Sequence, residues 1–176
     1  MVTVVLSGHP ALAQVKDRAT TAQTARNPLV IEQIVLNDKL IKGMLAASKD
    51  IDQITDNAPE NINELKPEAV AKLDAVTRRC GLASYAEYLS VRDNVYLALD
   101  GYDRVIKKYV GHDAVIKAEI ARTKADRKLS ASDKQEKIAG LNNSLQFRLP
   151  PVKYKTNIDL ALKYDSLIQS TMRSGD

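Results

Sequence analysis

Apolar residues recur at every third or fourth position through most of this chain, which is the period of an α-helix with one buried face. No window alternates apolar and polar residues for long enough to predict a sheet. The most regular stretch lies in the middle of the chain. One helical face there carries Tyr85, Tyr88, Val95, Leu99, Tyr102, Ile106 and Tyr109. The pattern therefore predicts an all-α protein in which residues 84–109 pack against most of the other helices.

The sequence marks the start of the central helix and a possible interruption within it. Ser84 followed by Glu87 is a capping box, in which the hydroxyl accepts the N–H of Glu87 and the carboxylate accepts the N–H of Ser84. Gly101 can adopt the left-handed conformation that closes a helix. Because the apolar face continues beyond Gly101, the sequence leaves open whether the helix kinks or breaks there.

Capping residues and prolines divide the rest of the chain. Asn27-Pro28 predicts the start of the first helix, Pro67 opens the second, and Gly81 closes it. Pro150-Pro151 predicts an extended link. The expected helices outside the central one cover residues 27–55, 67–80, 114–128, 130–145 and 157–172, the last capped by Asn157. A length of 176 residues suits one domain. We therefore expect a single-domain bundle of five to seven helices over residues 27–176.

Residues 1–26 differ from the rest of the chain. Ala11-Leu12-Ala13 followed by Gln14 has the small-x-small form of a signal-peptidase site, although Val2–Leu6 is a short apolar core and no basic residue precedes it. Residues 1–26 are therefore interpreted as a signal-peptide remnant and a mobile leader. This predicts a periplasmic protein, with a cytoplasmic one as the alternative. The sequence has no apolar run long enough for a transmembrane segment.

The net charge of +4 is unevenly distributed. Residues 27–76 hold five basic and nine acidic side chains, whereas residues 104–137 hold ten basic and five acidic ones. A basic region can contact phosphates, and a basic protein that binds nucleic acid is one alternative. However, Asp113, Glu119 and Asp126 are interleaved with these cations, and no aromatic residues are placed to stack on bases. A salt-bridged, solvated face is favoured, and no nucleic-acid partner is expected.

The sequence contains few residues that carry chemistry. His9 and His112 are the only histidines, and neither has a second ligand at helical spacing, so no metal site is predicted. Nucleotide-binding glycine motifs, a nucleophile elbow and a haem-attachment motif are missing, and we expect no cofactor. Cys80 is the sole cysteine. An enzyme that uses Cys80 as a nucleophile, next to Arg78 and Arg79, stays an alternative, but no catalytic residue is predicted.

A binding site is the remaining candidate for function. Arg92 interrupts the apolar face of the central helix, and it either pairs with a carboxylate such as Asp93 or Asp103 or contacts an anion in a groove. Tyrosines at this spacing either belong to the core or line a ligand cleft. The candidate rim consists of Tyr85, Tyr88, Arg92, Tyr96 and Tyr102.

Several segments of caps and core positions together carry a resemblance. They are Gly81–Glu87, Asp100–Asp103, Tyr109–Lys117, Ala125–Lys134 and Asn157–Asp165. In this pattern the chain resembles the small exported helical proteins of unknown function found in alphaproteobacteria. The resemblance implies a signal peptide and a periplasmic location, and it brings no catalytic residues. We therefore expect a non-enzymatic cell-envelope binding or interaction module. Its partner is an unknown protein or small molecule, and a homo-oligomer is one option.

Overall fold

The structure is a computed structural model that describes residues 30–55 and 66–172. Within these ranges the chain forms seven helices and one two-stranded antiparallel ribbon, which confirms the predicted all-α bundle. The elements are α1 (Asp38–Thr55), α2 (Pro67–Arg79), α3 (Tyr85–Asp100), β1 (Tyr102–Asp103), β2 (Lys108–Tyr109), α4 (His112–Ala125), α5 (Ala131–Ser144), α6 (Thr156–Lys163) and α7 (Asp165–Met172).

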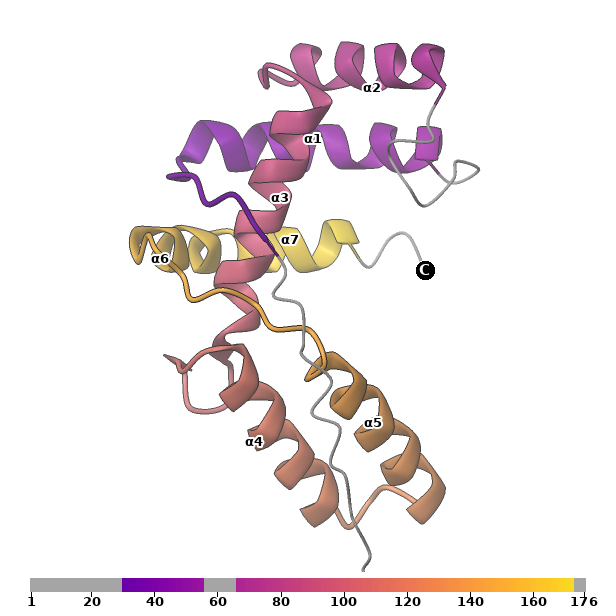
Figure 1. The fold of residues 1–176 in the computed structure, drawn as a ribbon, viewed down its shortest axis with the longest axis vertical. Helices are drawn as coiled ribbons and strands as arrows, with labels where there is room; N and C mark the ends of the chain where they lie inside the picture. Colours follow the sequence, from indigo (N-terminus) through magenta and orange to yellow (C-terminus); the bar gives the residue numbers. More distant parts are fainter. Residues whose placement is uncertain (1–29, 56–65, 173–176) are drawn as a thin grey trace, which may run out of the picture.

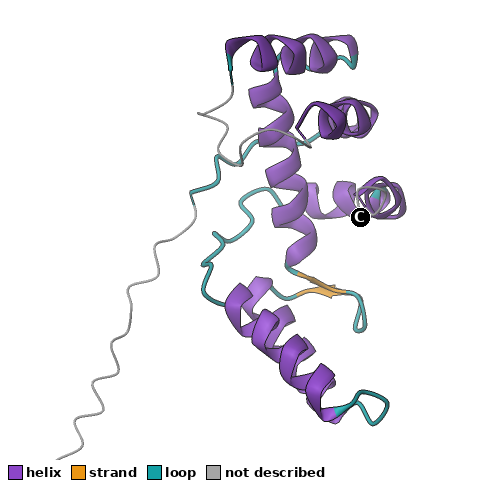
Figure 2. Cartoon of the chain, turned by 90° about the vertical axis from the view of Figure 1, so that its right-hand side faces the viewer, coloured by secondary structure: helices purple, strands orange, loops and turns teal. Residues whose placement is uncertain are grey.

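Helix α3 runs along the long axis of the molecule and organises the other elements (Figure 1). Helices α1, α2, α6 and α7 lie across it, and the α4–α5 hairpin projects beyond its C-terminal end (Figures 1 and 2). The core forms where these crossing helices meet α3. Its buried apolar side chains include Ile41, Met44, Leu73, Val76, Tyr85, Tyr88, Val91, Val95, Ala161, Tyr164 and Ile168. The predicted packing of other helices on α3 is therefore confirmed for α1, α2 and α6.

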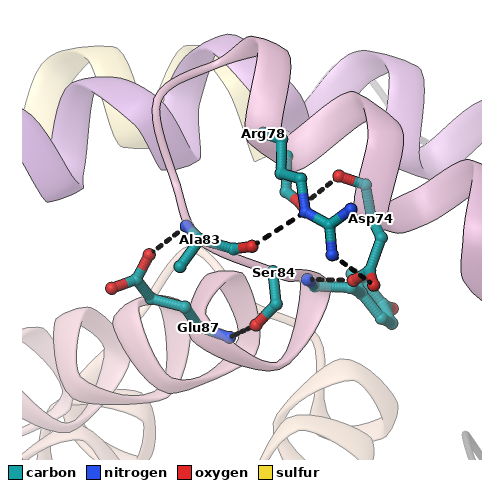
Figure 3. A network of polar contacts seen from close by, with 7 residues as sticks. Asp74, Arg78, Ala83, Ser84 and Glu87 are labelled. Carbon is teal, nitrogen blue, oxygen red and sulfur yellow. Dashed lines mark hydrogen bonds and ion pairs between the residues drawn. The ribbon is translucent and has the colours of Figure 1, made fainter.

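The corner between α2 and α3 is fixed by a network of caps (Figure 3). Ser84 Oγ accepts the N–H of Glu87 at 3.2 Å, as predicted. The Glu87 carboxylate, however, accepts the N–H of Ala83 rather than that of Ser84. Asp74 of α2 accepts the N–H of Tyr85 at 2.8 Å, and Arg78 donates to the carbonyl of Ala83 at 3.2 Å. These contacts satisfy backbone groups that a helix start leaves without partners inside the helix.

The first helix starts later than the sequence predicts. Residues 30–37 are extended, and α1 begins at Asp38 with Asn37 as its cap, since Asn37 Oδ1 accepts the N–H of Leu40 at 3.0 Å. The predicted cap at Asn27-Pro28 lies outside the described residues. The predicted end at Thr55 is confirmed. The helix prediction for residues 30–37 is therefore wrong, and the cause lies in contacts with distant parts of the chain.

Two buried asparagines hold this extended stretch. Asn94 of α3 accepts the N–H of Ile34 at 3.1 Å and donates to the carbonyl of Glu32 at 2.8 Å. Asn157 of α6 accepts the N–H of Leu36 at 2.9 Å and donates to the carbonyl of Ile34 at 2.8 Å. Each side-chain amide thus supplies the donor and the acceptor that a neighbouring strand would supply. Asn157 is consequently not the cap of the last helix, a position that Lys155 occupies.

Two other boundaries also differ from prediction, and a third, at Gly101, decides between the kink and the break that the sequence left open. Helix α4 covers His112–Ala125 instead of residues 114–128. The predicted last helix is interrupted at Tyr164, between α6 and α7. The central helix breaks at Gly101, whose φ of −86° is not left-handed. Beyond it, residues 102–109 form the β1–β2 ribbon instead of continuing the helix, and Ile106 is exposed.

Gly101 is needed for a close approach and not for its backbone angle. A Cβ atom at this position would lie 2.3 Å from Cε2 of Tyr109. We therefore expect Gly101→Ala to lower the free energy of unfolding by about 1–3 kcal/mol through overpacking. Gly140→Ala is the matched control, because nothing lies within 4 Å of its Cβ position. That change in the middle of α5 should instead stabilise the protein by about 0.5–1 kcal/mol. Urea unfolding of both variants checks the difference, and equal effects would contradict it.

Candidate functional site

The five candidate rim residues do not form one surface. Tyr85 and Tyr88 are buried in the core, where their rings stack with centroids 5.9 Å apart. Burial raises the pKa of the Tyr88 hydroxyl to about 12. Arg92 is half-exposed and pairs with Asp93 at 3.0 Å, one of the two carboxylates predicted for it. Tyr96 and Tyr102 line a common cleft.

That cleft lies where the α4–α5 hairpin joins the rest of the molecule, and we call it the junction cleft. Its volume is about 540 Å³. The end of α3, the strand β1, and helices α4, α5 and α7 all contribute to its walls. Apolar contributions come from Leu99, Val105, Val115, Ile116, Leu141 and Ile168. The cleft therefore combines residues from five elements that are separated by up to 73 positions in the sequence (Tyr96 to Gln169).

Ion pairs fix the polar wall of the junction cleft. Asp103 is buried and accepts from Arg122 Nη2 at 2.6 Å, and its other oxygen accepts the N–H of Val105 at 2.9 Å. Arg104 forms a two-bond pair with Asp165 of α7. The hydrogen bond from Arg122, more than any other contact, lowers the pKa of Asp103 below its usual value. The two guanidinium groups in this wall are thus already bound by carboxylates of the protein.

His112 separates the junction cleft from a second cleft of about 550 Å³ on the other side of α4, because it lines both. Its two ring nitrogens are buried, and neither has a hydrogen-bond partner in the described part of the chain. An imidazole offers at least one donor, and one acceptor when neutral, so this ring keeps unused hydrogen-bonding capacity between two cavities. The sequence indicated His112 only as an isolated histidine, and its position next to Gly111 gave no signal of a cleft.

Cys80 is remote from both clefts. It follows α2, at the other end of α3 from the junction cleft, and is partly buried against the core. Among the described residues, no group of histidine, cysteine and acidic side chains is arranged to bind a metal ion. No helix in the described ranges is long and apolar enough to cross a membrane. Among the described residues, the junction cleft is the candidate site that contains two of the predicted rim residues, Tyr96 and Tyr102.

Comparison with known proteins gives no match: no family model, no curated protein and no solved structure is similar to this chain at a significant level. The resemblance to exported alphaproteobacterial proteins consequently stays a prediction. The candidate site has to be argued from its own geometry.

The Asp103–Arg122 pair predicts a pH dependence of stability. The pKa of Asp103 is lower in the folded protein than in the unfolded chain, where it is about 3.9. The contribution of Asp103 to the free energy of unfolding is therefore complete above about pH 3.9 and is lost as the pH falls through the folded-state pKa. The parent protein should therefore be more stable than Asp103→Asn at neutral pH, and this advantage should shrink in strong acid. Urea unfolding at a series of pH values measures it. Asp93→Asn is the control, since the pair with Arg92 is half-exposed and solvent-accessible pairs contribute little. A difference that stays constant down to the lowest pH would contradict the assignment.

Proposed function

We propose that this protein is a non-enzymatic binding protein of the cell envelope that holds an amphipathic ligand in the junction cleft. The observation that carries the proposal is the meeting of Tyr96, Tyr102 and His112 above an apolar floor in a cleft of about 540 Å³. This volume falls within the range of about 300–1,000 Å³ that is typical of ligand pockets. Pockets of this kind bind mainly through apolar contacts and orient the ligand with a few polar groups.

The charges around the cleft favour a particular class of ligand. Arg104 and Arg122 are each held by a carboxylate, so neither guanidinium is available to neutralise a multiply charged anion. The imidazole of His112, whose ring nitrogens have no partner in the described part of the chain, can exchange hydrogen bonds with a hydroxyl, amide or carbonyl group. A molecule with an apolar body and one or two uncharged polar groups therefore suits the cleft best.

Location in the cell envelope rests on the sequence before residue 27, which lies outside the described residues. The small-x-small pattern Ala11-Leu12-Ala13, which precedes Gln14, supports export. N-terminal sequencing of the native protein tests this part, because a mature chain should begin at or near Gln14. A soluble cytoplasmic protein that retains Met1 would overturn it.

The basic region gives less support to a nucleic-acid partner. Lys137 pairs with Glu119 at 2.8 Å, and Arg122 contacts both Asp103 and Glu119. Several of the cations in residues 104–137 are therefore engaged within the protein. We expect no binding to DNA or RNA near physiological salt. A gel shift near physiological salt, with binding that weakens steeply as the salt concentration is raised, would favour a nucleic-acid partner over the proposed ligand.

Native mass spectrometry of the protein purified from its own host tests the ligand directly. We expect the protein to carry a retained small molecule. Ile116→Arg should abolish this additional mass, because Ile116 lines the cleft and a long charged side chain would occupy the apolar space. Arg92→Ala is the matched control, since Arg92 is outside the lining of the junction cleft. A bare chain, or a mass retained equally in Ile116→Arg, would contradict binding at this site.

A further inference from the structure

In the extended segment 31–36, the backbone groups along one edge are hydrogen-bonded to other described residues of the protein, whereas those along the other edge, here called the open edge, are not. Asn94 and Asn157 bind the backbone of Glu32, Ile34 and Leu36, all of which face the same side. Successive peptide groups of an extended chain point to opposite edges, so the N–H and C=O groups of residues 31, 33 and 35 point away from the two asparagines. Within the described part of the chain, the backbone of Gln33 and Val35 has no hydrogen bond.

This open edge lies at the surface. Val35, which belongs to this edge, is 57% exposed. The segment is nevertheless held firmly, since the side chain of Gln33 donates to the carbonyl of Pro151 at 2.9 Å and accepts the N–H of Lys153 at 2.7 Å. The segment is thus ordered before any partner arrives, which removes much of the entropic cost of pairing.

Other extended segments of the described chain are protected against pairing. The β1–β2 ribbon carries Arg104, Lys107 and Lys108, and the link before α6 carries Pro150 and Pro151. Lysines and prolines are the residues with which natural proteins block open strand edges. Segment 31–36 has neither, and its one charged residue, Glu32, belongs to the edge that Asn94 occupies.

We propose that a second copy of this chain pairs with the open edge, antiparallel and about a two-fold axis at Gln33. In this register Gln33 faces Gln33 of the second copy, and Ile31 faces Val35 of the second copy. The three pairs that result each exchange two hydrogen bonds. The sequence of the edge favours a second copy as the partner. Ile31 and Val35 are apolar and Gln33 is uncharged, so a two-fold axis at Gln33 brings no like charges together. The contact is small and pairs few residues, and the dimer is therefore concentration-dependent. It does not depend on the junction cleft.

Sedimentation velocity over a wide range of protein concentration tests the dimer. Val35→Pro removes an edge N–H, whereas the bonds of Asn94 and Asn157 use other residues and stay intact. We expect the parent to dimerise and Val35→Pro to raise the dissociation constant by about tenfold or more, since each copy loses a hydrogen bond and the ring obstructs the edge. Val35→Thr is the control, because it keeps both the N–H and the β-branched shape, and it should dimerise like the parent.

Hydrogen exchange of the parent protein gives a second measurement that needs no variant. The amides of Gln33 and Val35 should become protected as the concentration rises, whereas that of Leu36, already bound by Asn157, should change little. A monomer at every concentration would overturn the proposal. So would a dimer in which these two amides gain no protection, because its interface would then lie elsewhere.

Discussion

Replacing Asn157 by aspartate is expected to lower the free energy of unfolding by about 2–4 kcal/mol, although the side chain keeps its size. Asn157 is 3% exposed, and its Nδ2 donates to the carbonyl of Ile34 at 2.8 Å. An ionised aspartate has no proton to donate and would place an oxygen against this carbonyl oxygen. The cost combines a buried acceptor left unsatisfied, about 1–3 kcal/mol, with the burial of an unpaired charge. Urea unfolding at neutral pH measures it.

Asn142→Asp provides the matched control for this change. Asn142 is exposed on α5, and surface substitutions of this kind usually change stability by less than about 0.5 kcal/mol. A protonated aspartic acid at position 157 can donate again, so its folded-state pKa should be raised. The loss in Asn157→Asp should therefore be smaller below that pKa than at neutral pH. If Asn157→Asp and Asn142→Asp were equally stable, the amide would not hold the extended segment.

The helix boundaries that were predicted correctly depend on neighbours in sequence. Ser84 and Pro67 act at the first turn of their helices, and Gly81, with a φ of 87°, closes α2 within two residues of its last turn. Ser130 caps α5 in the same local way, by accepting the N–H of Asp133 at 3.1 Å. Such signals are complete in the sequence because every atom that takes part lies within a few residues.

The boundaries that were predicted wrongly depend on residues far away in the chain. Residues 30–37 have apolar side chains at helical spacing, but Asn94 and Asn157 lie 60 and 121 positions from the groups whose N–H they accept. Similarly, Tyr109 packs against Gly101 across the β1–β2 ribbon, which a helical spacing of tyrosines does not reveal. Periodicity therefore indicated an element correctly only where distant contacts did not supply other partners for the backbone.

The junction cleft was only partly accessible from the sequence for the same reason. Tyr96 and Tyr102 were among the predicted rim residues, but they share the cleft because the helix breaks between them, at Gly101. His112, Ile116 and Ile168 come from later helices, and no spacing pattern connects them with the tyrosines. Tyr85 and Tyr88 lie about two to three turns before Tyr96 on α3, in the part of the helix on which α1 and α2 pack, and are buried there.

Leu73→Ala is expected to lower the free energy of unfolding by about 2–5 kcal/mol, the usual cost of removing a fully buried leucine side chain. Leu73 has no exposed surface and anchors α2 in the core below the α2–α3 corner. For a chain of this length each kcal/mol lowers the melting temperature by roughly 2–4 °C, so calorimetry resolves the change easily.

Val70→Ala tests whether burial, and not the helix itself, sets this cost. Val70 lies three residues earlier on the same predicted apolar side of α2, but it is 36% exposed. Alanine has the higher helix propensity, by less than about 0.7 kcal/mol, and this gain should offset part of the modest loss of apolar contact. The two substitutions should therefore differ by about 2 kcal/mol or more. Equal losses would mean that burial of Leu73 does not anchor α2 in the core, and the capped corner at Ser84 would then have to hold α2 in place.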